Sequence, residues 1–170
     1  MEETLKKTIK LVAVFATATL AFGVAPAATA ANATKACLAL DTGGVDDKSF
    51  NASAWKGAND AKKANSSITV KYLAATSDAD YAPNIKKLVD EKCDIIVGVG
   101  FLINGAIVEA AKANPSVKFA IVDQDGEDHG ADGSVYPGKK FSNLKPLQFS
   151  TNESAFQAGY LAAGVSKTGK

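Results

Sequence analysis

A regular alternation of short apolar runs with helical patterns, from residue 36 onward, most constrains the fold of this chain. Four runs have the length and composition of buried strands. They cover residues 36–40, 68–73, 94–99 and 117–122. Apolar residues at spacings of three and four predict helices between them. These helices are expected over residues 47–64, 81–92 and 104–113. The alternation predicts the α/β class, a parallel sheet with helices on both faces.

Beyond the fourth strand the pattern is weaker. Residues 124–140 are rich in glycine and aspartate and predict a loop, while residues 147–150 predict a further strand and residues 153–165 a helix. We expect the first four strands to lie in the order 2-1-3-4, which brings their carboxyl ends to one edge. Ligands of such sheets bind at that edge.

The first 30 residues have the three-part pattern of a secretory signal peptide. Lysines precede an apolar stretch over residues 11–24, and small residues surround Ala30. We expect cleavage near Ala30 and export, which leaves residues 31–170 as the mature part. An uncleaved membrane anchor is the alternative. The alanine and threonine content favours cleavage, because a membrane-spanning helix needs about 20 strongly apolar residues.

The charge balance argues against a nucleic-acid partner. The formal net charge is +1, and all 19 cationic residues are lysines. Without a positive excess the chain has little electrostatic attraction for phosphates. Without arginine it lacks the bidentate donor most used to read guanine.

Cys37 and Cys93 are the only cysteines. Both would lie near the amino ends of adjacent strands, and disulfides persist in exported proteins. We therefore expect a disulfide between them, with two buried free thiols as the alternative. A lipobox has leucine and small residues just before the cysteine, but Thr34, Lys35 and Ala36 precede Cys37 and do not match it, so we expect no lipid on Cys37.

Two motifs raise the question of catalysis or metal binding. Residues 41–43 (DTG) match the start of an aspartic-protease signature, but that fold is all-β and the strand–helix alternation contradicts it. In the acidic loop, Gly126 comes too early for an EF-hand and no glutamate closes the loop. His129 is the only histidine, so no triad or zinc site can be assembled around it. We expect no enzyme activity, no cofactor and no metal.

The strand ends offer groups for recognition instead. Phe50 follows the first strand and can stack on a planar base. Asp41 and Asp123 can accept hydrogen bonds from amines, ring N–H groups or sugar hydroxyls, and Asn51 can both donate and accept. The alternative is that Phe50 belongs to the core and the aspartates cap helices. Composition alone leaves both open.

Longer motifs resemble those of a known family. Residues 41–51 (DTGGVDDKSFN), followed by residues 54–57 (AWKG), closely resemble the basic membrane protein family of solute-binding proteins. These proteins serve ABC importers and include purine-nucleoside receptors. Weaker matches follow in the family's order. They are residues 72–73, 77–81, 94–101, 118–123, 155–162 and 166–169. The resemblance covers essentially all of residues 36–170.

The resemblance implies one lobe of a type I periplasmic-binding-protein clamshell that closes on a nucleoside. Phe50 would stack on the base, while Asn51 and Asp123 would hydrogen-bond its edge. Asp41 would line the same side of the cleft, and Ser49 would make a secondary contact. Asp46 and Asp47 match family positions, but we interpret them as helix caps.

The family continues into a second lobe where this sequence ends, at Lys170. We therefore expect residues 31–170 to form the N-terminal lobe, with the second lobe absent. The resemblance also implies an ABC permease as partner and a place in the periplasm or on the extracytoplasmic face of the membrane. We expect a monomer. An exported adhesion- or antigen-like protein that uses the lobe as a scaffold is the alternative.

Overall fold

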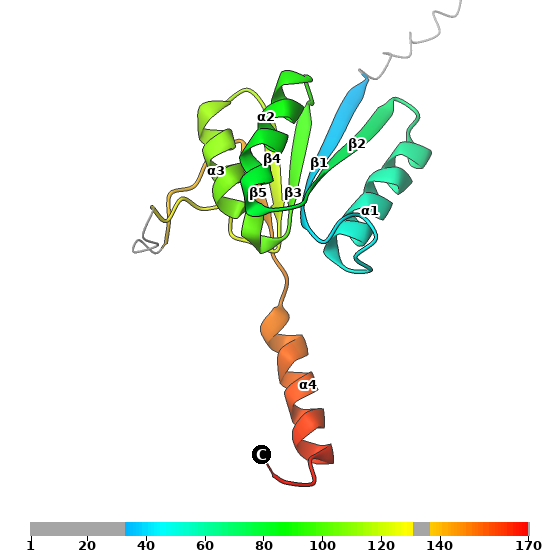
Figure 1. Cartoon of the computed structure of the whole chain (residues 1–170), viewed down its shortest axis with the longest axis vertical. Coiled ribbons are helices and arrows are strands. Elements are labelled where there is room, and N and C mark those ends of the chain that lie inside the picture. The colour runs from blue at the N-terminus through cyan, green and yellow to red at the C-terminus, as the bar shows by residue number, and fades with distance from the viewer. Residues whose placement is uncertain (1–32, 131–136, 170) are drawn as a thin grey trace, which may run out of the picture. The chain divides into compact units, whose positions relative to one another are not determined.

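The computed structural model describes residues 33–130 and 137–169. The predicted signal peptide therefore lies outside the described residues. A five-stranded parallel sheet forms the centre, in the order β2-β1-β3-β4-β5 (Figure 1). The strands are β1 (Thr34–Thr42), β2 (Ile68–Ala75), β3 (Ile95–Val99), β4 (Lys118–Val122) and β5 (Leu144–Leu147). The α/β class and the order of the first four strands are confirmed.

Helices follow the strands as the alternation predicts. They are α1 (Phe50–Ala64), α2 (Tyr81–Asp90), α3 (Asn104–Ala113) and α4 (Thr151–Val165). Short 3₁₀ turns, η1 (Asp78–Asp80) and η2 (Phe101–Ile103), precede α2 and α3. Helix α1 covers one face of the sheet, and α2 and α3 cover the other (Figure 1).

The core has two parts, one on each face of the sheet. On the face of α2 and α3, Ile85 and Leu88 pack with Ile107 against Ile96 and Phe119 of the strands, all nearly inaccessible to solvent. The core under α1 is smaller. It contains the buried Leu38, Leu40 and Val99, with Trp55 of α1 packed edge-on against Tyr72 of β2 at 4.8 Å between ring centres.

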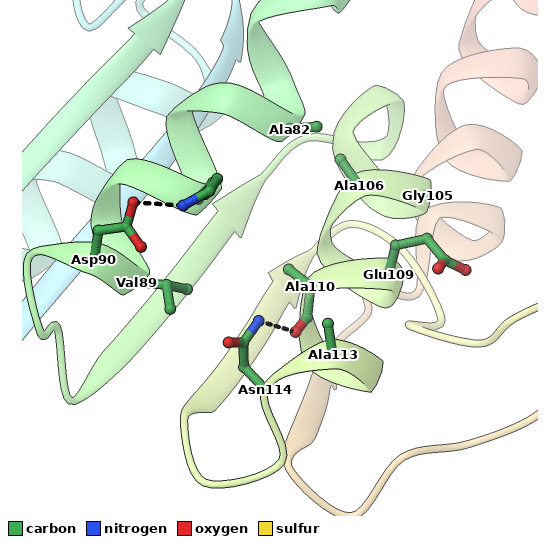
Figure 2. A pocket seen from close by; sticks show the side chains of 10 residues that line it. Ala82, Val89, Asp90, Gly105, Ala106, Glu109, Ala110, Ala113 and Asn114 are labelled. Atoms are coloured by element: carbon green, nitrogen blue, oxygen red, sulfur yellow. Dashed lines mark hydrogen bonds and ion pairs between the residues drawn. The ribbon is translucent and has the colours of Figure 1, made fainter.

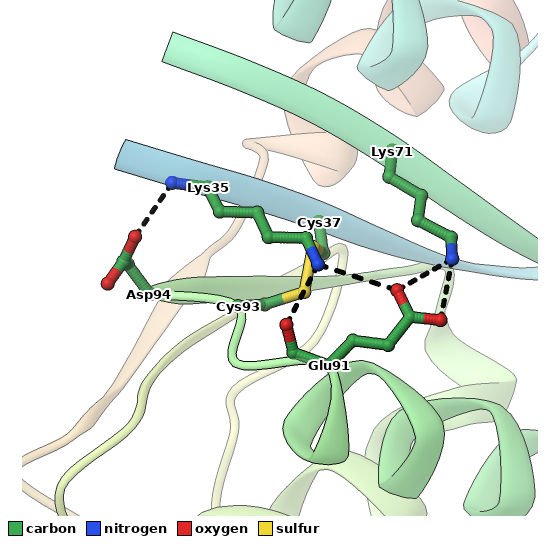
Figure 3. The surroundings of a disulfide bond; sticks show 6 residues. All are labelled: Lys35, Cys37, Lys71, Glu91, Cys93 and Asp94. Carbon is green, nitrogen blue, oxygen red and sulfur yellow. Dashed lines mark hydrogen bonds and ion pairs between the residues drawn. A yellow bond between two sulfur atoms is a disulfide. The ribbon is translucent and has the colours of Figure 1, made fainter. Parts of the chain in front are cut away.

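A disulfide joins Cys37 of β1 to Cys93, which lies just before β3, with their Cα atoms 6.0 Å apart (Figure 3). Both residues are buried. Charged groups surround the bridge at the amino ends of the strands. The Glu91 carboxylate binds the Lys71 ammonium at 2.6 Å and the Lys35 ammonium at 3.5 Å. These ion pairs hold the pKa of Glu91 below its usual value, with the hydrogen bond from Lys71 as the largest cause.

Helix α1 begins at Phe50, three residues later than predicted, because Asp47 serves as its cap from outside the helix. The Asp47 carboxylate accepts hydrogen bonds from the backbone N–H groups of Ser49, Asn51 and Ala52, at 2.8 to 3.0 Å. These bonds, that from Ala52 foremost, lower the pKa of Asp47. Of the two predicted caps, Asp47 is therefore the one whose side chain binds the first turn.

The fifth strand was predicted at residues 147–150, and this position is wrong. Strand β5 runs from Leu144 to Leu147 and pairs with β4. Leu144 is buried in the core, which fixes the strand there. Pro146 within the strand is tolerated because β5 is an edge strand, where a missing N–H on the outer side breaks no ladder hydrogen bond.

Helix α4 differs from the other three helices. All 15 of its residues are exposed, including Phe156, Tyr160, Leu161 and Val165 at 66–78% of their full exposure. The sequence predicted this helix, but not that its apolar residues would lack a covering surface.

Candidate functional site

The carboxyl edge of the sheet gathers the predicted site residues. Asp41 lies near the end of β1, Asp123 follows β4, and Ser49 with Phe50 begins α1 directly after the β1 turn. Since β3 separates β1 from β4, the backbones at Asp41 and Asp123 are about 10 Å apart, two strand spacings. The edge is thus wide enough for a small planar ligand.

Asp41 and Asn51 form a pair behind this edge. The Asn51 amide donates to the Asp41 carboxylate at 2.9 Å, and the Asn51 side chain is completely buried. Its amide oxygen has no hydrogen-bond partner among the described residues, so a donor from a ligand or an ordered water would satisfy it. Asn51 therefore positions Asp41 in this structure and does not face solvent. Direct contact of Asn51 with a base remains a prediction.

Gly100 after β3 makes room for Asp41. Its backbone has φ of +95°, a conformation that favours glycine, and a Cβ atom there would overlap the Asp41 carboxylate. Burial raises the pKa of Asp41, the hydrogen bond from Asn51 opposes this rise, and the Asp47 charge adds to it. Asp41 is therefore a hydrogen-bond acceptor held in a partly desolvated position.

Phe50 is exposed, not a core residue, and it has an aromatic neighbour. The rings of Phe50 and Phe149 lie 5.8 Å apart, tilted by 54°. With Ser49 and Ser53 they line an open hollow of about 330 Å³. Sequence reasoning missed Phe149 because it assigned this residue to a strand. Its position just past the end of a parallel strand, which marks the ligand edge, was the signal that could have found it.

Asp123 stands at the end of β4 in a left-handed backbone conformation, with φ of +67°. Such a conformation is uncommon for residues other than glycine, although aspartate adopts it more readily than most. The Asp123 backbone N–H donates to the carbonyl of Leu147 at 2.9 Å, which holds the turn against β5. The side chain is half-buried. Among the five predicted residues, Ser49 and Phe50 are exposed, Asp41 and Asp123 are half-buried, and Asn51 is buried.

A larger hollow of about 540 Å³ lies between α2 and α3, on the outer face of the lobe (Figure 2). Ala82, Ala106, Ala110 and Ala113 line it, and an ion pair between Lys86 and Asp90 lies at its rim. Ligand sites combine apolar walls with a few converging polar groups. In this groove Asp90 is neutralised by Lys86, so the carboxyl edge is the better candidate.

A group of potential metal ligands occurs in the acidic loop. Within the described residues, the ligating atoms of Asp125, Glu127 and His129 lie within 4.8 Å of one another. However, the Glu127 carboxylate binds the Gly138 backbone N–H and the Lys140 ammonium, and Asp125 is hydrogen-bonded to His129. These contacts give the carboxylates roles in holding the loop.

In the described part of the chain, no helix is both long and apolar enough to cross a bilayer.

Comparison with known proteins adds the family. The model of the Bmp family, described as "ABC transporter substrate-binding protein PnrA-like", matches residues 34–170. The chain belongs to the Bmp family. This confirms the family resemblance seen in the motifs.

Two curated relatives and one solved structure illustrate the similarity. The "CD4+ T-cell-stimulating antigen" of Listeria monocytogenes is 35% identical over 78% of this chain and 35% of its own length. The "ABC transporter nucleoside-binding protein BmpA" of Lactococcus lactis is 35% identical over 80% of this chain and 36% of its own length. An ABC transporter solute-binding protein from Aeropyrum pernix has a TM-score of 0.63 at 25% identity, over 76% of this chain and 32% of its own.

This Bmp family chain thus spans about a third of the length of the curated relatives it matches. The family is one of solute-binding proteins of ABC transporters, and the observed sheet is of the kind found in such proteins.

Proposed function

We propose that residues 31–170 form the N-terminal lobe of an extracytoplasmic solute-binding protein, and that its carboxyl edge binds purine nucleosides. The observation that carries the proposal is the exposed ring of Phe50, next to Phe149 and on the edge that also holds Asp41 and Asp123.

The chemistry of the edge suits a neutral base with hydrogen-bond donors. Phe50 is 40% exposed and Phe149 58% exposed, so their faces are available to an aromatic ring. Stacking of one base on such a side chain contributes about 1–3 kcal/mol. Asp41 and Asp123 supply acceptors, which match exocyclic amines, ring N–H groups and ribose hydroxyls. The chain has no arginine for a phosphate, which favours a nucleoside over a nucleotide.

The rest of the proposal concerns transport. Residues 1–30 act as a signal peptide with cleavage near Ala30, and the lobe acts outside the cytoplasm. A second lobe would enclose the other side of the ligand, because small ligands are commonly enclosed over 70–90% of their surface. An ABC permease in the membrane would receive the nucleoside. The nucleoside-binding relative supports the ligand class.

A second candidate function rests on the relative named as a T-cell-stimulating antigen. In that case the lobe would serve as an exported scaffold without a nucleoside ligand. Titration with nucleosides separates the two candidates.

The test is isothermal titration calorimetry of the mature chain with adenosine, guanosine and inosine. We expect Phe50→Leu, which removes the ring but keeps an apolar side chain, to weaken binding about 5- to 150-fold. Phe50→Tyr keeps the ring and should retain affinity. Equal affinity of Phe50→Leu and the unsubstituted chain would reject the stacking site. Absence of heat with all three nucleosides would favour the scaffold.

A further inference from the structure

Three alternate residues of the loop between β4 and β5 bring metal-ligating groups together. The ligating atoms of Asp125, Glu127 and His129 lie within 4.8 Å of one another. The Asp125 Oδ2 atom and the His129 Nε2 atom are 2.8 Å apart. Two carboxylates and an imidazole form a mixed oxygen and nitrogen donor set, which is more selective than a group of acidic residues alone. These residues are not among those proposed to bind the nucleoside.

Glu127 is a carboxylate in a buried position. Its side chain is only 9% exposed, whereas that of its ion-pair partner Lys140 is 79% exposed. An exposed lysine compensates a buried charge only weakly. Buried charges in proteins are paired or coordinate a metal. The Glu127 carboxylate accepts one hydrogen bond, from the Gly138 backbone N–H at 2.7 Å. Because a carboxylate has about four acceptor sites, Glu127 retains positions that can bind a cation.

An oxygen atom of α3 without a hydrogen-bond partner belongs to the same region. A hollow of about 420 Å³ lies between α3 and the loop, and Asn104, Glu127 and His129 are among the residues that line it. The Asn104 Oδ1 atom is buried and has no hydrogen-bond partner among the described residues. A buried acceptor of this kind indicates a bound water molecule or ion. Asn104 lies on a different element, so this observation is independent of the contacts within the loop.

The loop holds the three side chains in place through its own backbone. Asp128, between two of them, exchanges two backbone hydrogen bonds of 2.9 Å with Lys139. Gly138 packs closely against the same two residues. A Cβ atom at Gly138 would lie 2.8 Å from the His129 Nδ1 atom and 2.9 Å from the Glu127 Cβ atom. The ligands are therefore positioned by both legs of the loop, as a preorganised site requires.

We propose that Asp125, Glu127 and His129 bind one Zn²⁺ ion. Zinc binds carboxylate oxygens and histidine nitrogens at about 2.0–2.2 Å, commonly with four ligands in a tetrahedron. Atoms bound in this way lie about 3.5 Å apart, so side-chain movements of about 1 Å bring the three groups onto one ion. A water molecule in the hollow is the fourth ligand, with the Asn104 oxygen as its acceptor.

The donor set selects zinc over harder cations. Ca²⁺ takes six to eight oxygen ligands, whereas one of the three donors here is a nitrogen. The two carboxylates neutralise the charge of a divalent ion. From the sequence we expected no metal, because the chain has a single histidine. In the folded loop the two carboxylates supply the ligands that further histidines or cysteines provide in other zinc sites.

The test is a titration of the mature chain, without an affinity tag, with Zn²⁺ in competition with a chromophoric chelator. Cys37 and Cys93 are joined to each other and buried, so no thiolate competes for the ion. We expect one equivalent of Zn²⁺ to bind. His129→Gln and Asp125→Asn should each weaken binding at least about tenfold. Absence of binding, or unchanged affinity in His129→Gln, would overturn the proposal.

Glu109→Gln is the matched control. Glu109 is exposed on α3 and lines the same hollow, but it is not one of the three ligands. Its replacement should change the Zn²⁺ affinity by less than about twofold, because exposed charges are screened by salt. An equal loss of affinity in Glu109→Gln and Asp125→Asn would overturn the assignment, since the negative charge of the hollow alone would then attract the ion.

Nuclear magnetic resonance gives a measurement that needs no substitution. His129 is the only histidine, so the imidazole C–H resonances report this site alone. We expect them to shift until one equivalent of Zn²⁺ has been added, and to stay in place with the same amount of Ca²⁺. Equal shifts with both cations, or bound Zn²⁺ without a shift, would refute ligation by the imidazole.

Discussion

Reduction of the Cys37–Cys93 disulfide should destabilise the lobe by an amount set by the loop that it closes. The bridge joins residues 56 positions apart, β1 to the segment before β3. In the chain-entropy description, closing a loop of this length removes about 4 kcal/mol of conformational freedom from the unfolded chain. For a urea dependence of about 2 kcal/mol per molar, the unfolding midpoint should fall by about 2 M.

Urea titration with and without a phosphine reductant measures this change. Trp55 is the only tryptophan and packs on Tyr72, so its fluorescence reports unfolding directly. The variant Cys37→Ala/Cys93→Ala should have the urea midpoint of the reduced chain, and the reductant should not change that midpoint. Oxidised and reduced midpoints within about 0.3 M of each other would refute the reasoning. Nucleoside affinity should be unaffected, since the bridge lies near the amino ends of the strands.

Two further predictions concern the carboxyl edge. Gly100→Ala should cost at least about 2 kcal/mol in unfolding free energy, because alanine strains the backbone and overlaps Asp41. Gly105→Ala in α3 meets no atom within 4 Å and should instead stabilise by up to about 1 kcal/mol in the same urea titration. The raised pKa of Asp41 means that the folded chain binds its proton more tightly than the unfolded chain. Its contribution to stability is therefore present below the unfolded value of 3.8 and is lost as the pH rises through the raised pKa. In urea titrations, the stability of Asp41→Asn should increase relative to the unsubstituted chain as the pH rises above the unfolded value of 3.8, and a pH-independent difference would contradict this.

The sheet could be predicted because its signals are local and strong. Buried strands such as β3 and β4 are continuous apolar runs, and the helices between them force parallel pairing. The edge strand was less predictable. Leu144 to Leu147 contains a proline and a lysine, and only its pairing with β4 makes it a strand. Tertiary pairing of this kind leaves little trace in the local sequence.

The candidate site was predictable in its position but not in the directions of its side chains. Strand ends in the sequence placed Asp41, Asp123 and Phe50 at one edge, as observed. The sequence does not show that the Asn51 side chain points into the interior. A polar residue next to an aromatic one is equally compatible with an amide that faces solvent and with one that is buried. Phe149 could not be assigned to the edge while β5 was misplaced by three residues.

The arrangement of residues 47–51 explains how an aromatic ring is kept exposed at this edge. The Asp47 carboxylate holds the first-turn amides of Asn51 and Ala52, and the Asn51 side chain bonds Asp41 in the interior. Successive helical residues point about 100° apart, so an inward Asn51 directs Phe50 outward. Full burial of a phenyl ring contributes about 1.5–3 kcal/mol, so leaving 40% of Phe50 exposed forgoes roughly 1 kcal/mol. The polar residues around Phe50 are thus bound to one another, while the one apolar residue is left uncovered, which is the arrangement expected where a ligand supplies the missing contact.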